Sequence, residues 1–176
     1  MKIIFSPSKK MVFSEELITE QQSFFLKEAN YLLHLLKSCS AQELQNIWQI
    51  STQLFVKYRQ QLDSIDTMRG KMPSIYAYSG LSFQHLSVRA MTDKQIFYLE
   101  KHLRILSAMY GVLKPMDAVV PYRLEMQATI GKLSLKKFWQ EKIRQYFQNE
   151  EIINVCLLYT SPSPRDISGS RMPSSA

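Results

Sequence analysis

Cysteine, glycine and histidine are scarce in this sequence, and each scarcity excludes a class of site. The two cysteines, Cys39 and Cys156, are too few for a disulfide framework or a zinc site built on cysteines. The five glycines form no dinucleotide-binding motif, P-loop or nucleophile elbow. His34, His85 and His102 stand far apart, without the paired spacing of metal ligands. We therefore predict no metal, no cofactor and no catalytic residue of a standard type.

Long hydrophobic runs are also absent. No apolar stretch approaches the ~20 residues of a transmembrane helix. The first apolar residues are interrupted by Pro7, too early for a secretory signal. We therefore expect a cytoplasmic protein with reduced thiols, no membrane association and no obligate protein partner.

The sequence does have an ordinary globular composition with an excess of positive charge. Hydrophobic residues make up 45% of the 176, and the formal net charge is +7. Residues 94–146 carry ten basic and four acidic side chains, so most of the excess lies in this stretch. Such a surplus is typical of a surface that faces a polyanion, but it can also serve solubility alone.

Serine and proline become frequent near the end of the chain. Residues 156–176 contain six serines and three of the seven prolines, without apolar periodicity. This composition predicts a disordered segment. We interpret it as a tail that is not native to the protein, although an ordinary flexible terminus would look the same. The predicted domain therefore covers residues 1–155.

Periodicity and capping residues predict a single α+β domain. Residues 2–5 and 152–155 are expected to form strands, and residues 74–78 have the β-branched and aromatic side chains typical of another. Apolar residues at helical spacing continue from Ile96 to Leu106. Helices are expected to begin at Ser14, Ser40, Ser51, Thr92 and Ser134.

A small, polar and basic loop follows the first predicted strand. Its residues, Ser6-Pro7-Ser8-Lys9-Lys10, offer hydroxyl, amide and ammonium donors. Donors of this kind at the end of a strand can hold a phosphate. A strand-to-helix connector with incidental lysines is the simpler interpretation, and it stays open.

Two motifs between residues 110 and 126 combine glycine, proline and charge. Gly111 permits a tight backbone turn, and Lys114 and Arg123 supply cations that Asp117 and Glu125 could orient. A helix followed by a glycine turn is loosely what a helix-hairpin-helix unit needs, with its turn amides near a DNA backbone. The alternative is a rigid connector bounded by prolines, with an internal contact between Arg123 and Glu125.

The last predicted helix mixes cations with aromatic residues. Phe138, Trp139 and Tyr146 share its apolar side, so we assign them to the core. Lys136 and Lys137 lie elsewhere on the helix, where they could contact phosphates or form a solvated surface.

Several of these motifs occur together in one known family. The runs LRILSAMYGVLKPMD, over residues 103–117, and PYRLEM, over residues 121–126, closely resemble the signature of the YaaA peroxide stress protein family. The Ser-Pro-Ser-Lys of residues 6–9 resembles the start of that family. The resemblance extends, in order, over residues 1–155. It also includes Tyr78, Gly80, Phe83 and the strand Ile152-Ile153-Asn154.

This resemblance implies a bacterial cytosolic protein that limits hydrogen peroxide damage, partly by lowering reactive intracellular iron. It also implies one compact domain of mixed helices and strands. A positively charged cleft and a helix-hairpin-helix-like element would bind double-stranded or distorted DNA. The DNA contacts expected from the family motifs and from charge are Lys9, Arg104, Lys114, Arg123, Lys136 and Lys137, with Gly111 at the hairpin turn.

The same residues leave a second function open. An enzyme could use them to form a cleft for a small anionic or phosphorylated substrate. Because no nucleophile–base pair is visible, a non-enzymatic DNA-binding protein is the leading hypothesis. The residues of such a cleft would be Lys9, Tyr110, Asp117, Tyr122, Arg123 and Glu125.

The sequence departs from the family pattern in three places, and one of them is Leu81, where many members have an acidic residue after the glycine. Ala108 stands where the family has the first glycine of a G-x-Y-G segment, which weakens the case for a tight hairpin. The family continues beyond Val155 with further strands, so the chain resembles a domain truncated at about three-fifths of its length, with unpaired strand edges. We therefore expect the 176-residue chain to be marginally stable or to aggregate when expressed alone.

Overall fold

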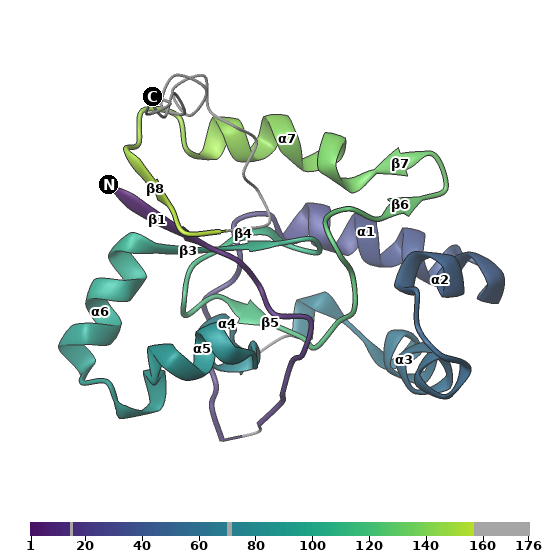
Figure 1. Cartoon of the computed structure of the whole chain (residues 1–176), viewed down its shortest axis with the longest axis horizontal. Helices are drawn as coiled ribbons and strands as arrows, with labels where there is room; N and C mark the ends of the chain where they lie inside the picture. Colours follow the sequence, from purple (N-terminus) through teal and green to yellow (C-terminus); the bar gives the residue numbers. More distant parts are fainter. Residues whose placement is uncertain (15, 70–71, 157–176) are drawn as a thin grey trace, which may run out of the picture.

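A four-stranded sheet forms the centre of the fold in a computed structural model, which describes residues 1–14, 16–69 and 72–156 (Figure 1). The strand order is β4-β3-β1-β8. Strand β1 pairs in parallel with both β3 and β8, whereas β4 pairs antiparallel with β3. The carboxyl ends of three strands therefore meet at one edge of the sheet. The strands are β1 (Lys2–Phe5), β3 (Leu103–Ser107), β4 (Gly111–Leu113) and β8 (Ile152–Asn154).

Helices cover both sides of this sheet. Arg104 of β3 donates a hydrogen bond to Tyr146 of α7, whereas Phe5 of β1 packs against Phe83 of α5, and Figure 1 shows α7 and α5 on opposite sides. The helices are α1 (Leu26–Ser38), α2 (Ala41–Trp48), α3 (Thr52–Ser64), α4 (Ser74–Ala77), α5 (Leu81–Leu86), α6 (Asp93–His102) and α7 (Leu135–Tyr146). The shorter elements are η1 (Thr67–Arg69), η2 (Val88–Ala90), β2 (Met72–Pro73), β5 (Ala118–Val119), β6 (Thr129–Ile130) and β7 (Leu133–Ser134).

The core confirms the apolar faces that periodicity predicts for α1 and α7. Leu32 and Leu36 of α1 are fully buried, and so is Trp139 of α7. Trp139 packs edge-on against Phe25, with ring centroids 5.4 Å apart. Each fully buried side chain of this size contributes about 1.5–3 kcal/mol to folding.

The α+β class is confirmed, and so are the two capping boxes. Ser40 Oγ accepts from the Glu43 N–H at 3.3 Å, while the Glu43 carboxylate accepts from the Ser40 N–H at 2.8 Å. Thr92 and Gln95 form the same pair at the start of α6. These signals depend only on neighbouring residues, which is why the sequence alone predicts them.

The helix predicted to begin at Ser14 begins instead at Leu26. Tertiary hydrogen bonds hold the preceding segment in an irregular conformation. The Gln21 carbonyl accepts from the Ala118 N–H at 2.7 Å, and the Gln21 amide donates to Glu100 and Asp117. A helix through Gln21 would use that carbonyl internally, so the tertiary bonds override the local capping signal.

Residues 74–78 were predicted as a strand but contain the short helix α4. Ser74 fixes this turn, because its hydroxyl donates to the Lys114 carbonyl at 2.7 Å and its N–H donates to the Asp117 carbonyl at 2.9 Å. The Tyr78 N–H then closes the turn on the Ser74 carbonyl. Tertiary contacts again decide against the local β-propensity.

The apolar stripe predicted as helix through Leu106 changes at Leu103 into strand β3. Every residue of β3 is buried, and the strand lies between two partners. Leu103 and Leu106 keep the helical spacing across this boundary, so the apolar pattern alone does not show where the helix ends and the strand begins.

Strand β8 is an outer strand of the sheet, and Ile152 and Ile153 are each 44% exposed. Cys156, the first residue of the predicted tail, is buried with its thiol against the Ser6 hydroxyl. The tail residues 157–176 lie outside the described residues. Within the described residues, no helix has both the length and the apolar character needed to cross a membrane.

Candidate functional site

The carboxyl ends of the parallel strands bring polar side chains to one edge of the sheet. Ser8 and Lys9 follow β1, and Ser107 ends β3. Ser8 Oγ donates to the Ser79 carbonyl at 3.0 Å and accepts from the Lys10 N–H at 3.2 Å, which fixes the loop after β1. Ligands commonly bind at this edge of a sheet with parallel strands. This edge of the sheet is therefore the candidate site.

Lys9 and Arg123 converge on a single carboxylate, and we call Lys9, Arg123 and Glu125 the edge cluster. Lys9 Nζ lies 2.9 Å from Glu125 Oε1, and Arg123 Nη2 lies 4.0 Å from the same oxygen. The contact between Arg123 and Glu125, one of the alternatives in the sequence, is thus confirmed. The Lys9 side chain is 68% exposed, whereas that of Arg123 is only 17% exposed. The cluster therefore combines an exposed surface cation with a largely buried one.

Arg123 is held by packing against an aromatic ring. Its guanidinium carbon lies 5.2 Å from the centre of the Tyr58 ring, at cation–π distance. Its Nε is buried and has no hydrogen-bond partner within the described part of the chain. Leaving a buried donor unpaired costs about 1–3 kcal/mol, so an anion that accepted from this nitrogen would bind more favourably.

A chain of buried hydroxyl groups supports the cluster. The Tyr122 hydroxyl lies 2.9 Å from the Tyr78 hydroxyl and 2.7 Å from Ser107 Oγ, which accepts from the Tyr110 N–H at 2.9 Å. Burial raises the pKa of Tyr78 and Tyr122 above their ordinary value. Both phenols therefore stay neutral at physiological pH. This row of hydroxyl groups thus adds no charge next to Arg123.

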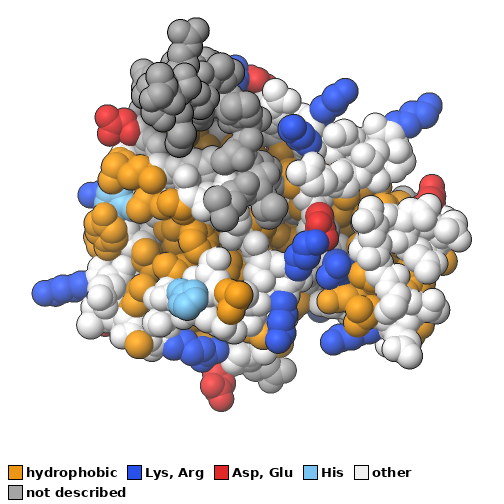
Figure 2. All heavy atoms as spheres, viewed as in Figure 1, with side chains coloured by type: hydrophobic (Ala, Val, Ile, Leu, Met, Phe, Trp, Pro, Cys, Tyr) orange, Lys and Arg blue, Asp and Glu red, His pale blue; other side chains and the backbone are white. Residues whose placement is uncertain are grey.

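Two hollows flank Lys9 and Tyr122. The larger has a volume of about 510 Å³ and lies against α3, and we call it the α3 hollow. The smaller, of about 150 Å³, extends from the Pro7–Lys9 loop to Glu125. Figure 2 shows basic side chains around an acidic one near the middle of one face, and a broad apolar area over α6. The α3 hollow is lined by Lys9, Phe13, Lys57, Tyr58, Gln61 and Tyr122, among others.

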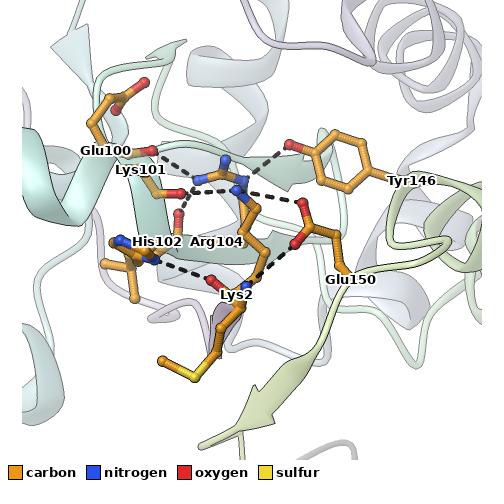
Figure 3. Close-up of polar contacts among 9 residues, drawn as sticks. Lys2, Glu100, Lys101, His102, Arg104, Tyr146 and Glu150 are labelled. Carbon is orange, nitrogen blue, oxygen red and sulfur yellow. Dashed lines mark hydrogen bonds and ion pairs between the residues drawn. The ribbon is translucent and has the colours of Figure 1, made fainter.

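Arg104 lies away from the edge cluster and is 5% exposed. Its Nε donates to the Tyr146 hydroxyl at 3.0 Å, and its Nη1 donates to the Glu100 carbonyl at 2.9 Å. Figure 3 shows the guanidinium between the Tyr146 ring and the last turn of α6. Lys2 and Glu150 form an ion pair close to it. Nε and Nη1 of Arg104 thus donate to groups within the chain.

The other predicted DNA contacts are spread over the surface. Lys114 is exposed but follows β4, beside the amino-terminal end of β3 and so at the opposite end of the sheet from Lys9. Lys136 and Lys137 are exposed in the first turn of α7. Of the six predicted contacts, the structure brings only Lys9 and Arg123 into one cluster. Contact with DNA stays a prediction for all six.

Gly111 lies in a β-hairpin rather than in a helix-hairpin-helix unit. It begins β4 and pairs with Ser107 across the turn formed by residues 108–110. Its φ of +70° is a backbone conformation that glycine adopts without strain. The helical alternative fails because β3 occupies the position of the first helix.

Sequence motifs do not identify the residues on the far wall of the α3 hollow. Phe13, Lys57 and Tyr58 belong to segments without a recognisable motif. The pairing of a lysine with a tyrosine at 57–58 is too common to single out a site. These side chains line the α3 hollow only because α3 packs against the loop after β1.

Comparison with known proteins decides the family. The family model described as "Peroxide stress protein YaaA" matches residues 1–158. This chain belongs to the YaaA peroxide stress protein family. A UPF0246 protein of Pediococcus pentosaceus is 37% identical over 161 residues, and one of Lactobacillus delbrueckii subsp. bulgaricus is 36% identical over 157. The two matches cover 88% and 87% of this chain.

The chain spans about 64% of the length of these two YaaA-family relatives. The match to a UPF0246 protein of Lachnoclostridium phytofermentans, 38% identical over 143 residues, covers 79% of this chain and 56% of that protein. The names of the relatives state no activity. What the whole YaaA-family protein does is therefore a matter for proposal.

A second polar cluster in this YaaA-family chain joins the irregular segment before α1 to α6. Gln21 Nε2 donates to Glu100 Oε1 at 2.7 Å and to Asp117 Oδ1 at 2.8 Å. Burial raises the pKa of Asp117 to about 6, against the opposing effect of hydrogen bonds from Gln21 and the Lys114 N–H. Within the described residues, no His, Cys, Asp or Glu group of three or more could hold a metal ion.

Asp117 is expected to make the fold more stable in mild acid. Because its pKa is higher in the folded state than in the unfolded chain, the folded state binds the proton more tightly, and this advantage is lost as the pH rises through about 6. Its contribution to the free energy of unfolding should fall by about 1.4 kcal/mol between pH 5 and pH 7.5. Urea unfolding of wild type and Asp117→Asn at both pH values measures this difference. An equal pH dependence in both proteins would contradict it, and Asp63→Asn, at an exposed aspartate, is the control.

Proposed function

We propose that this YaaA-family protein acts in the bacterial cytoplasm under peroxide stress by binding DNA through phosphate contacts at the edge cluster. The observation that supports this is the convergence of Lys9 and Arg123 at the carboxyl edge of the parallel strands. Lysine and arginine donors are the usual ligands of DNA phosphates. Limitation of intracellular iron belongs to the same proposal, and no residue is assigned to it.

The charges around the cluster suit a polyanion without base readout. Lys57 on the wall of the α3 hollow adds a cation beside Lys9. Glu125 is the carboxylate at the centre, and a DNA phosphate would replace it as the acceptor for Lys9. Binding of this kind depends on phosphate charge, so it should tolerate any sequence. Arg104 is left out of the proposed interface because its Nε and Nη1 donate to groups inside the fold.

Salt dependence tests this proposal. Two to three phosphate contacts predict that affinity for a fluorescent duplex falls about 10- to 40-fold between 50 and 200 mM salt. Lys9→Ala should weaken binding to all sequences alike and make the logarithmic salt slope about one unit less steep. The matched control is Lys101→Ala, an exposed lysine at the end of α6. Salt-independent binding, or equal effects of the two variants, would contradict the proposal.

A second candidate function is binding of a small anionic ligand, and the α3 hollow favours it. Its volume of about 510 Å³ lies within the ~300–1,000 Å³ typical of small-molecule sites. Lys9, which lines the hollow, would supply donors to the anion, and the unpaired Nε of Arg123 belongs to the adjoining edge cluster. No reaction is assigned to this ligand.

A further inference from the structure

We propose that the α3 hollow binds a nucleoside monophosphate, with its phosphate at the edge cluster and its base against Phe13. This inference rests on the second candidate function, the binding of a small anionic ligand, and it specifies the chemical class of that ligand. Its phosphate would take the position that the proposed function gives to a DNA phosphate, so the two ligands would compete for the edge cluster.

Glu125 marks the position of the phosphate. Its carboxylate is the anionic acceptor for Lys9, at 2.9 Å, and lies 4.0 Å from Arg123. A phosphate monoester carries more negative charge and more acceptor oxygens than a carboxylate, so it can take the place of Glu125. The Glu125 side chain is 40% exposed and is free to turn into solvent when displaced. The buried Nε of Arg123 would then gain the acceptor that it lacks.

The opposite wall of the hollow suits a nucleobase. Phe13 lines the hollow and is 58% exposed, and within the described residues no other aromatic ring packs against it. Base stacking on an aromatic ring buries such a surface. Gln60 also lines the hollow, and its amide group can pair with the polar edge of a base. The Gln61 amide nitrogen on the same wall donates to the Pro121 carbonyl at 3.0 Å, which leaves its amide oxygen as an acceptor.

Size and position favour a mononucleotide over a longer ligand. The hollow holds about 510 Å³, and Lys9 is the member of the edge cluster that lines it, so the phosphate position lies at its rim. One phosphate therefore lies at its rim and one organic group fills its interior. A phosphate alone would leave Phe13 uncovered.

Calorimetric titration of the whole chain with adenosine 5′-monophosphate, inorganic phosphate and adenosine tests the inference. The monophosphate should bind at least about tenfold more tightly than inorganic phosphate, because only it combines both contacts. Phe13→Ala should remove most of this tenfold advantage and leave phosphate affinity unchanged. Phe97→Ala, at a 73% exposed ring on α6, is its control. Glu125→Gln should tighten both phosphate ligands several-fold, whereas Glu151→Gln, at an exposed glutamate before β8, should not.

The outcomes separate the nucleotide inference from the anion site on which it rests. If inorganic phosphate binds and the monophosphate binds no more tightly, the nucleotide inference is wrong and the anion site survives. If neither phosphate ligand binds, both are wrong. If the monophosphate binds tightly and Phe13→Ala has no effect, the assigned position of the base is wrong.

Discussion

Gly111→Ala is expected to lower the free energy of unfolding by about 3–5 kcal/mol, or to leave the chain unfolded. Gly111 has φ +70°, where an alanine is strained by about 1–2 kcal/mol. A Cβ at this position would also lie 2.5 Å from Trp139 Cζ3 and 3.0 Å from Phe25 Cδ2, in the core. Because these two rings are buried and packed against each other, neither can move away without further cost.

Gly131 provides the matched control for this substitution. It has φ +57°, but a Cβ there would meet nothing within 4 Å. Gly131→Ala should therefore cost only the backbone strain, about 1–2 kcal/mol. Urea unfolding of the two variants separates strain from steric overlap. Equal losses would contradict the role of Gly111 in admitting Trp139 to the core.

Trp139→Ala is expected to cost about 3–5 kcal/mol, the range for truncating a buried aromatic side chain. Trp139 is 1% exposed, and its Nε1 donates to the Ala108 carbonyl at 2.8 Å in the turn between β3 and β4. Its removal leaves a cavity and an unpaired carbonyl beside the edge of the sheet that carries the site. Phe97→Ala, at an exposed ring on α6, should change the stability by less than about 0.5 kcal/mol.

The effects of Gly111→Ala and Trp139→Ala on stability should not be additive, because a Cβ added at Gly111 overlaps most closely with the Trp139 ring. In the Trp139→Ala background, Gly111→Ala should cost about 1–2 kcal/mol, close to the strain alone. Unfolding curves of the double variant measure this coupling. Full additivity would show that the ring does not limit the space at Gly111.

The sequence predicts those parts of the fold that depend on neighbouring residues. Capping boxes at Ser40 and Thr92 involve residues three positions apart, so their signals are complete within one helical turn. The sequence does not predict β3, because Leu103 and Leu106 continue the helical spacing of Ile96 and Leu99 into the strand. It also misplaces the start of α1, where bonds from Gln21 to distant residues decide the conformation.

The candidate site was predictable only in part for the same reason. Lys9 and Arg123 attract attention through their motifs, and the local contact of Arg123 with Glu125 follows from their spacing of two. The meeting of Lys9 with Glu125 depends on the order of strands in the sheet, which no local pattern contains. Phe13 and Tyr58 enter the site through packing alone.

The central claim is that Lys9, Arg123 and Glu125 form one anion-binding site, and a charge exchange within the cluster tests it most directly. Lys9→Glu should weaken binding to a fluorescent duplex by at least about tenfold, because it places a second carboxylate beside Glu125. The double variant Lys9→Glu with Glu125→Lys returns a cation to the same place, so it should regain most of the lost affinity. If the double variant binds as weakly as Lys9→Glu, or if Lys9→Glu binds as tightly as wild type, the edge cluster is not the site.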